Sequence, residues 1–395
     1  MKRLLPIAVV LLSCIITCQA QGIAFVSTSW DETVQNAVKN DKQIFLYAQT
    51  KSCRYCRQME KEVFTDPGVI DFYNKHFISY KIDVDDDGPG EALSKQYGVM
   101  GFPTYLYFDK SGQKLHQSSR FKSADAFIQD AIDASNPDKA LFSLMNKYDR
   151  GEKSPELLFN LSNALSYYLV DDSPKEKITE EYLATQSVKE LESEKNLRFI
   201  FDNHGDIKSS ATRYLLENQE KFVPLFGKAD VDKTSQRIVT RTAEIAGRAN
   251  DQALMDDLKK IITGSFADTA KALSVAGIYF YRGREDWPNY AKATLHYGST
   301  VGTTDWQTMY ESGAYLKYFA KDQETLKIAV QVMDKVLKLH KNYEHLCIYS
   351  RLQSKVGNNV LALKAANEAT ELAKREGQDG DEARKLIAEL SAAKK

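Results

Sequence analysis

The first third of the chain alternates between two hydrophobic periods, which predicts helices and strands in turn. Residues 29–40 carry apolar positions at helical spacing, and Ser29 with Glu32 has the spacing of a capping box. Residues 43–48 form a short unbroken apolar run, as in a strand covered on both faces. Further strands are expected at 77–83, 105–108 and 114–117, and further helices at 69–75, 91–97 and 123–134. This order predicts an α/β domain over 22–135, whose sheet combines parallel pairs with an antiparallel edge.

The hydrophobic period stays helical from about residue 140 to residue 395, which predicts an all-α second domain. Over 305–392, small and apolar residues have the spacing of tetratricopeptide-like helix pairs. These positions are Leu346, Tyr349, Gly357, Ala362, Ala366 and Ala369. No comparable repeat is evident before residue 300, so plain helices are expected there. The aromatic residues expected to pack between those helices are Trp287, Tyr290 and Tyr297.

The N-terminus has the layout of a secretory signal peptide. Lys2 and Arg3 precede an apolar run that ends in small residues, so residues 1–20 are expected to be removed after Ala20 and the chain to be secreted or periplasmic. The alternative is a lipoprotein anchored at Cys14, because Leu-Leu-Ser-Cys resembles a lipoprotein processing box. Removing residues 1–20 makes the formal net charge of −1 more negative, so no basic field for nucleic acid is expected.

Two of the five cysteines form a Cys-x-x-Cys motif where the apolar run 43–48 gives way to an amphipathic helix. Two thiols at this spacing can close into a small disulfide ring and reopen. A helix N-terminus and the nearby cations Lys51, Arg54 and Arg57 should favour the thiolate of Cys53. Cys53 is therefore the expected nucleophile, and Cys56, one turn further on, is expected to resolve the mixed disulfide that Cys53 forms.

Other site types fit the sequence less well. Zinc would need two more ligands beside the cysteine pair, and the acidic stretch 83–88 lacks the glutamate that a calcium loop needs, since Ser94 stands at that position. We therefore expect no metal. Cys347 lies between apolar residues of a predicted helix, which favours a buried structural thiol. Motifs of zinc proteases, serine hydrolases and phosphate-binding loops are lacking in the sequence.

Residues 41–112 resemble the thioredoxin-like family, in particular the secreted branch in which a methionine follows the Cys-x-x-Cys motif. The resemblance rests on five segments, which are Cys53-Arg54-Tyr55-Cys56, Met59-Glu60, Val63-Phe64, Lys81-Ile82-Asp83-Val84-Asp85, and Tyr97 to Thr104. It implies that the loop formed by Gly101, Phe102, Pro103 and Thr104 lies against the cysteines, that Pro103 is cis, and that substrate backbone pairs with this loop.

Four positions depart from the pattern of thioredoxins proper. Tyr47 replaces a buried aspartate that assists proton transfer from the second thiol, and Ser52 replaces a tryptophan. Arg54 and Tyr55 stand between the cysteines in place of Gly-Pro, and this dipeptide helps to set the stability of the thiolate. The sequence therefore leaves open whether the reaction runs as reduction, isomerisation or oxidation of disulfides.

The sequence as a whole favours a secreted thiol–disulfide oxidoreductase that reduces or isomerises protein disulfides, with no cofactor beyond the Cys53–Cys56 disulfide. Its expected partners are a disulfide-containing protein, an electron-donor protein, membrane-bound or soluble, and a protein partner on the helical region. The alternative is a non-catalytic scaffold in which the thioredoxin-like module is structural, and Tyr47 is the residue that favours it.

Overall fold

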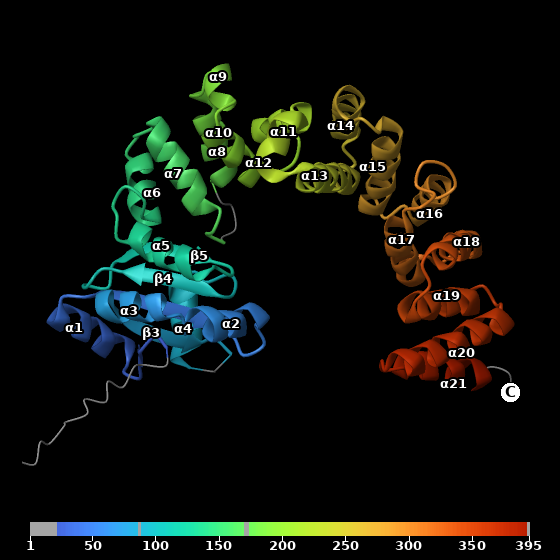
Figure 1. The fold of residues 1–395 in the computed structure, drawn as a ribbon, viewed down its shortest axis with the longest axis horizontal. Helices are drawn as coiled ribbons and strands as arrows, with labels where there is room; N and C mark the ends of the chain where they lie inside the picture. Colours follow the sequence, from blue (N-terminus) through green and yellow to red (C-terminus); the bar gives the residue numbers. More distant parts are fainter. Residues whose placement is uncertain (1–21, 86–87, 170–173, 393–395) are drawn as a thin grey trace, which may run out of the picture. The chain divides into compact units, whose positions relative to one another are not determined.

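The structure is a computed structural model, and it describes residues 22–85, 88–169 and 174–392. The expected signal peptide and the Cys14 box lie outside these residues. The chain divides into two compact units, one ending at Thr185 and the other beginning at Gln186. Each unit is described by itself below, with elements labelled as in Figure 1.

The first unit is built on a five-stranded mixed sheet, which confirms the predicted α/β class. The strands are β1 (Phe25–Val26), β2 (Gln43–Gln49), β3 (Phe77–Asp83), β4 (Thr104–Phe108) and β5 (Lys114–Ser119). Their order is β1-β3-β2-β4-β5, with β1, β3 and β2 parallel and with β4 and β5 antiparallel to their neighbours. Sequence reasoning missed β1, because two residues are too few to establish a period.

Six helical segments accompany the sheet, as the hydrophobic periods indicate. They are α1 (Trp30–Asn40), α2 (Arg54–Gln58), the π-helix η1 (Met59–Val63), α3 (Pro67–His76), α4 (Pro89–Gln96) and α5 (Ala124–Ala134). The capping box at Ser29 and Glu32 is present at the start of α1. Alternate residues of β2 enter two different cores, since Phe45 and Tyr47 join one cluster and Ile44 joins the other.

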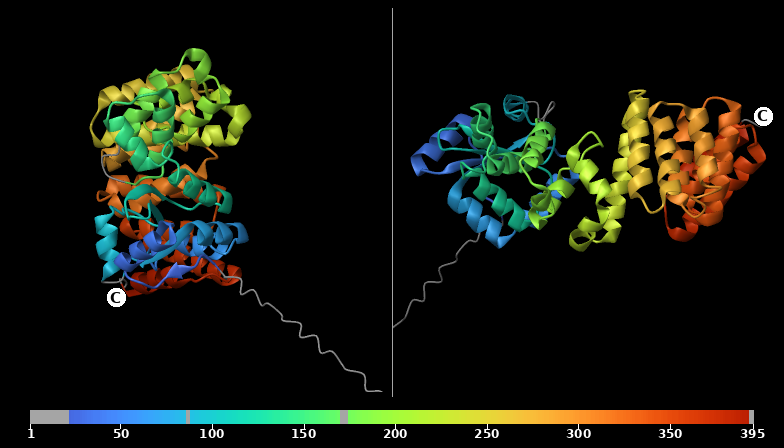
Figure 2. Two further views of the ribbon diagram at one scale, coloured as in Figure 1. Left: turned by 90° about the vertical axis from the view of Figure 1, so that its left-hand side faces the viewer. Right: turned by 90° about the horizontal axis from the view of Figure 1, so that it is seen from above.

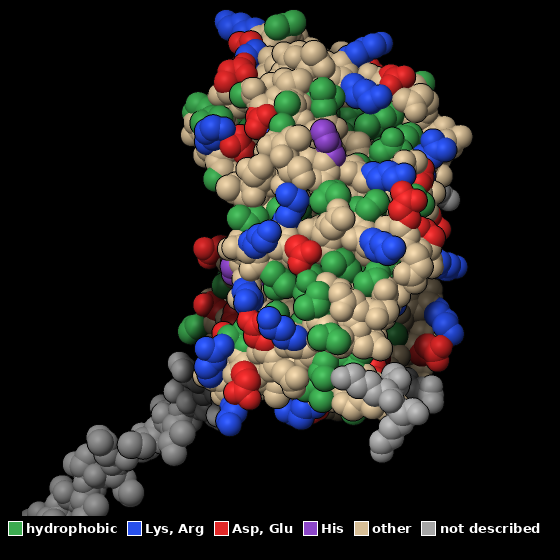
Figure 3. All heavy atoms as spheres, turned by 90° about the vertical axis from the view of Figure 1, so that its right-hand side faces the viewer, with side chains coloured by type: hydrophobic (Ala, Val, Ile, Leu, Met, Phe, Trp, Pro, Cys, Tyr) green, Lys and Arg blue, Asp and Glu red, His purple; other side chains and the backbone are tan. Residues whose placement is uncertain are grey.

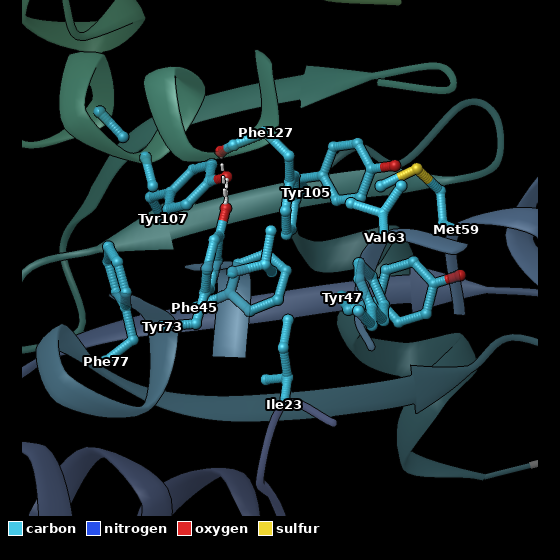
Figure 4. Packing of buried hydrophobic residues seen from close by; sticks show 14 of the residues in the cluster. Ile23, Phe45, Tyr47, Met59, Val63, Tyr73, Phe77, Tyr105, Tyr107 and Phe127 are labelled. Atoms are coloured by element: carbon cyan, nitrogen blue, oxygen red, sulfur yellow. Dashed lines mark hydrogen bonds between the residues drawn. The ribbon is translucent and has the colours of Figure 1, made fainter. Parts of the chain in front are cut away.

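Aromatic rings dominate the core cluster that contains Cys56 (Figure 4). The hydroxyl groups of Tyr73 and Tyr107 are 2.8 Å apart, and Tyr73 donates to the carbonyl of Phe127 at 3.0 Å. A buried hydroxyl group without a hydrogen-bond partner lowers stability, and these contacts provide partners for both tyrosines. In Figure 4, Tyr47 and Met59 lie at the opposite end of the cluster from Tyr107.

Three further helices complete the first unit: α6 (Leu141–Asp149), α7 (Pro155–Leu165) and α8 (Lys175–Ala184). The period changes to helical near residue 140, as expected, yet the compact unit continues to Thr185. The reason is that α6 packs on the edge strand β5, and the backbone N–H of Leu141 donates to Nδ1 of His116 at 3.0 Å. The sheet is thus covered by helices that the change in period alone would assign to the following domain.

The second unit is entirely helical, in agreement with the predicted class. Its helices are α9 (Val188–Leu191), α10 (Glu194–Asp202), α11 (Ser210–Glu217), α12 (Gln219–Phe226), α13 (Lys228–Arg248), α14 (Gln252–Ser265), α15 (Thr269–Gly283), α16 (Trp287–Tyr297), α17 (Trp306–Phe319), α18 (Gln323–Leu339), α19 (Tyr343–Lys355), α20 (Asn359–Glu376) and α21 (Asp381–Ala392). From α13 onward they stand side by side (Figure 2). Tyr290 and Tyr297 are buried among them, and the ring of Trp287 stacks on Phe319.

Small residues bring several of these helices close together. Ala362, Ala366 and Ala369 of α20 are fully buried, and α20 packs on α19. Helices α13 and α15 also pack closely, although no repeat was expected before residue 300. Their backbones approach so closely that a Cβ atom at Gly247 would lie 2.1 Å from the carbonyl oxygen of Phe280. A side chain at Gly283 would meet Glu244 in the same way. Close backbone packing therefore extends to helices before residue 300.

The surface carries charges of both signs. On the face shown in Figure 3, Lys and Arg side chains are interspersed with Asp and Glu. Within the residues that the structure describes, no helix combines the length and the apolar character needed to cross a bilayer.

Candidate active site

The loop that leads from β2 to the first cysteine is held by two acidic residues. The backbone N–H of Lys51 donates to Asp85 at 2.7 Å, and the side-chain amide of Gln49 donates to Asp83 at 3.0 Å. Asp83 also accepts from the backbone N–H of Asp85 at 3.1 Å. Both carboxylates belong to the acidic stretch considered above for calcium. In the structure, they fix the approach to Cys53.

Cys53 is the N-cap residue of α2, and Cys56 lies one turn inside the helix. The Sγ atom of Cys53 accepts a hydrogen bond from the backbone N–H of Cys56 at 3.1 Å. Cys53 is partly exposed, whereas Cys56 is fully buried. A side chain at an N-cap accepts N–H groups of the first helical turn, and here the Cys53 sulfur accepts one such bond and stays partly accessible.

The second thiol has the opposite character. Burial raises the pKa of the Cys56 thiol to about 12, and the side chain of Cys53 adds to the increase. The Thr50 backbone and the Tyr47 hydroxyl act in the other direction without offsetting it. At neutral pH, Cys56 is therefore held as a protonated thiol, and its attack on a disulfide requires that the proton be transferred.

Tyr47 occupies the place of the missing aspartate. Its hydroxyl donates to the carbonyl oxygen of Cys56 at 3.4 Å, and burial raises the Tyr47 pKa far above its ordinary value, with further increases from Cys56 and Glu60. Tyr47 thus cannot act as a base at neutral pH. Glu60, at the start of η1, forms a 2.6 Å ion pair with Lys81. The charge of Glu60 is thus one of the influences on the Tyr47 pKa. Glu60 belongs to the Met59-Glu60 segment of the family resemblance, but sequence reasoning assigned it no role at the site.

The cations expected around Cys53 differ in their contacts. Lys51 is exposed, with its Nζ 3.9 Å from the Asp83 carboxylate, and Arg57 donates to the carbonyl of Lys51 at 2.8 Å. Arg54 and Tyr55 are also exposed, with 56% of Tyr55 accessible. The side chains at 54 and 55 are therefore available to an incoming polypeptide, while Arg57 is used to hold the loop.

The predicted substrate loop lies on the same core cluster as the cysteines. Phe102 and Cys53 both pack against this cluster. The Phe102–Pro103 peptide bond is cis. The hydroxyl of Thr104 donates to the carbonyl of Gly101 at 2.6 Å, and the carbonyl of Pro103 accepts from the backbone N–H of Arg120 at 3.1 Å. The structure thus adds Arg120, which sequence reasoning did not identify, to the loop.

A buried charge network lies behind this loop and was also missed. The Asp130 carboxylate accepts from Ser118 at 2.6 Å and from Tyr107 at 3.0 Å, and His116 Nε2 and Lys122 Nζ each lie 3.4 Å from it. Burial would raise the Asp130 pKa, but Lys122, His116 and Ser118 hold it well below its ordinary value. These residues come from β4, β5, the β5–α5 loop and α5, so the sequence spacing carries no motif for them.

The described residues contain no group of three or more His, Cys, Asp and Glu side chains arranged to hold a metal ion. Cys347 is buried in α19, and burial raises the pKa of its thiol. Its burial agrees with the structural role favoured by the sequence.

The comparisons with known proteins concern the first unit. The family model described as a thioredoxin-like domain matches residues 30–129. The thiol:disulfide interchange protein DsbD of Actinobacillus pleuropneumoniae serotype 5b (strain L20) is 30% identical over 89 residues, which are 22% of this chain and 15% of that protein. DsbD of Haemophilus influenzae (strain 86-028NP) is 32% identical over 101 residues, 25% of this chain and 17% of the relative. The chain thus spans about a sixth of the length of these relatives.

Among solved structures, a protein of Bacteroides thetaiotaomicron assigned as a disulphide-isomerase is 33% identical, with a TM-score of 0.28. The match covers 30% of this chain and 97% of that protein.

Proposed function

From the thioredoxin-like domain at residues 30–129, we propose that this chain is a thiol–disulfide oxidoreductase that reduces or isomerises disulfides of protein substrates. The observation that carries the proposal is the contrast between two thiols one helical turn apart. The partly exposed Cys53 accepts the Cys56 N–H, and the buried Cys56 has a pKa of about 12.

The reaction proceeds in two exchanges. The Cys53 thiolate attacks one sulfur of a substrate disulfide, forms a mixed disulfide with it, and releases the other sulfur as a thiolate. Cys56 then loses its proton and attacks Cys53 Sγ, which releases the reduced substrate and leaves the Cys53–Cys56 disulfide. Two electrons pass to the substrate, so a dithiol donor must return two electrons to the disulfide before the next cycle.

The environment of Cys56 separates the two steps. Its high pKa keeps Cys56 protonated until the mixed disulfide forms, so it does not compete with Cys53 for the substrate. We assign the Glu60 carboxylate, which Lys81 holds by an ion pair, as the base that receives the Cys56 proton by way of the Tyr47 hydroxyl. Substrate backbone would lie along Gly101 to Thr104, and the exposed Arg54 and Tyr55 would contact the substrate on the opposite side of Cys53.

The signal-peptide pattern of residues 1–20 supports a secreted or periplasmic location, with lipid anchoring at Cys14 as the alternative. Two proteins are expected as partners: a disulfide-containing substrate and an electron donor, membrane-bound or soluble. The helical second unit is expected to dock a protein partner.

The test uses a Cys56→Ser chain in a Cys347→Ala background, so that Cys53 is the remaining thiol of the processed protein. With disulfide-bonded insulin as the probe, this chain should accumulate a mixed disulfide at Cys53, detected by non-reducing electrophoresis and mass spectrometry. The Cys53→Ser chain in the same background is the matched control and should trap nothing. A Cys56→Ser chain that stays free of adducts, although the wild type reduces insulin, contradicts the proposal.

The alternative function is a scaffold in which the thioredoxin-like domain is structural, and the replacement of a buried acid by Tyr47 favours it. Two measurements, of disulfide exchange and of partner binding, distinguish the two functions. If neither the wild type nor Tyr47→Asp exchanges with any disulfide probe, while Cys53→Ser retains every partner of the wild type, the scaffold assignment is the correct one.

A further inference from the structure

A pocket of about 510 Å³ lies in the first unit between α5, the loop that precedes it, and α7. The residues that matter for its chemistry are Phe121, Lys122, Gln129, Phe159, Asn163 and Tyr167. Helix α7 lies outside the span matched by the thioredoxin-like family, residues 30–129. The pocket therefore exists because this chain adds helices to that domain.

One wall of the pocket is linked to the candidate active site through Lys122. Lys122 is two residues after Arg120, whose N–H binds the Pro103 carbonyl, and the N–H of Lys122 itself donates to the sulfur of Met59 at 3.5 Å. Met59 belongs to the same buried cluster as Cys56. A polypeptide held along the Pro103 loop would thus extend over residues that open into the pocket.

The opposite wall is fixed to the same loop. The hydroxyl of Ser119 donates to the carbonyl of Tyr167 at 2.7 Å. The side chain of Leu169 lies so close to Gly101 that a Cβ atom at this glycine would be 3.0 Å from it. Arg120, which contacts Pro103, and Leu169, which contacts Gly101, are each two residues from a lining residue of the pocket, Lys122 and Tyr167. The pocket is therefore close to the loop of residues 101–104, on which the substrate would lie.

The charges of the pocket are balanced within it. Lys122 lies 3.4 Å from Asp130, and Lys139 lies 3.0 Å from Asp133. The Lys122 ammonium also lies over the ring of Tyr167, 4.3 Å from its centroid. A charged ligand group would disrupt these pairs or remain uncompensated, whereas an uncharged apolar group would gain contact with the rings of the pocket.

We propose that this pocket is a specificity subsite that takes a large uncharged side chain, aromatic or aliphatic, of the polypeptide whose disulfide reacts with Cys53. The proposal rests on the proposed function, since the side chain belongs to the substrate of that reaction. The pocket gives the chain a preference among disulfides that the thiols alone cannot provide, because a small disulfide makes no contact with it.

The experiment uses synthetic peptides, each with a single cysteine in a mixed disulfide with thionitrobenzoate. Cys53 thiolate attacks the peptide sulfur, forms a Cys53–peptide disulfide and releases coloured thionitrobenzoate, which gives a second-order rate constant. Peptides differ in carrying Phe or Ala at each position within five residues of the cysteine. For at least one position, the wild type should react about tenfold faster with the Phe peptide than with the Ala peptide.

The matched variants place a tryptophan on α5 at neighbouring exposed positions. Ala126 lines the pocket and is exposed, so Ala126→Trp should fill the mouth of the pocket without disturbing the fold and should abolish the preference for Phe. Asp125 is exposed but does not line the pocket, so Asp125→Trp should keep the preference. Both variants should react with 5,5′-dithiobis(2-nitrobenzoate), a small disulfide, at the rate of the wild type.

Each failure has a distinct meaning. A wild type that reacts with the small disulfide but shows no preference for Phe at any position overturns the subsite. A preference that survives in Ala126→Trp overturns it as well. If the wild type reacts with none of these disulfides, the proposed function itself is wrong.

Discussion

The buried pair of Lys122 and Asp130 offers a quantitative test of how the first unit is held together. The side chains of Lys122 and Asp130 are only 7% and 10% exposed, and their charged atoms lie 3.4 Å apart. The carboxylate also accepts hydrogen bonds from Ser118 and Tyr107. Removing one partner of such a pair leaves the other charge buried without compensation, which costs more than the loss of the pair as a whole.

We expect Lys122→Met to lower the free energy of unfolding of the first unit by about 3–5 kcal/mol. Asp130→Asn should be destabilising as well, because Lys122 then remains buried and charged. The double variant removes both charges. Its loss of unfolding free energy should therefore be smaller than the sum of the two single losses, by at least about 1.5 kcal/mol. Additive effects would refute the assignment of the pair as one coupled unit.

The assay follows urea unfolding by tryptophan fluorescence. Trp30, the tryptophan of the first unit, packs against Tyr80 and Phe108, whereas Trp287 and Trp306 belong to the second unit. In a Trp287→Phe, Trp306→Phe background, the fluorescence therefore reports on the first unit alone. The same background chain without further changes is the control.

The pH dependence provides a second readout for Asp130. Its pKa is held below the unfolded value of about 3.9, so the folded state binds fewer protons than the unfolded chain. The resulting stabilisation is complete above the unfolded pKa and is lost as the pH falls through the folded pKa. Stability of the wild type should thus fall more steeply below about pH 5 than that of Asp130→Asn, whose side chain does not titrate.

Three further predictions concern the thiols and the second unit. Cys53 should be alkylated by iodoacetamide at least about tenfold faster than Cys56 at mildly acidic pH, as measured by mass spectrometry, because Cys56 is buried and has a pKa of about 12; equal rates would contradict the assigned roles. Gly247→Ala should destabilise the second unit by about 1–3 kcal/mol in thermal unfolding, since its Cβ would overlap the Phe280 carbonyl, whereas Gly264→Ala in α14, where a Cβ meets nothing within 4 Å, should be neutral or slightly stabilising. Burial lowers the pKa of His345, so the unfolded chain binds more protons and the stability of the second unit should decline as the pH falls below about 6.5, a decline that should be smaller in His345→Phe.

The chemistry of the candidate site was accessible from the sequence to the extent that it is local. Cys53 and Cys56 are three positions apart, and the apolar run before them shows where the chain leaves the sheet. The position of Cys53 as the N-cap of α2 follows from neighbouring residues alone. The sequence also indicated that Tyr47 stands where an acid would be expected.

The sequence could not show which residues influence Tyr47 or surround the pocket. Glu60 pairs with Lys81 across 21 positions, and the site of Asp130 gathers side chains from β4, β5, the β5–α5 loop and α5. Each of these residues has a polar or aromatic side chain that is equally compatible with a surface position. Their roles depend on burial, which is a property of the packed structure.

The division of the chain shows the same limit. The hydrophobic period by itself determined the α/β class of the first domain, the helical class of the remainder and the place where one gives way to the other, because period depends on the backbone geometry of neighbouring residues. Only the tertiary structure decided that α6, α7 and α8 belong with the sheet and create a pocket beside the thiols. An apolar helix face is compatible with many partners, and the one it covers is selected by shape and by buried polar contacts such as that between Leu141 and His116.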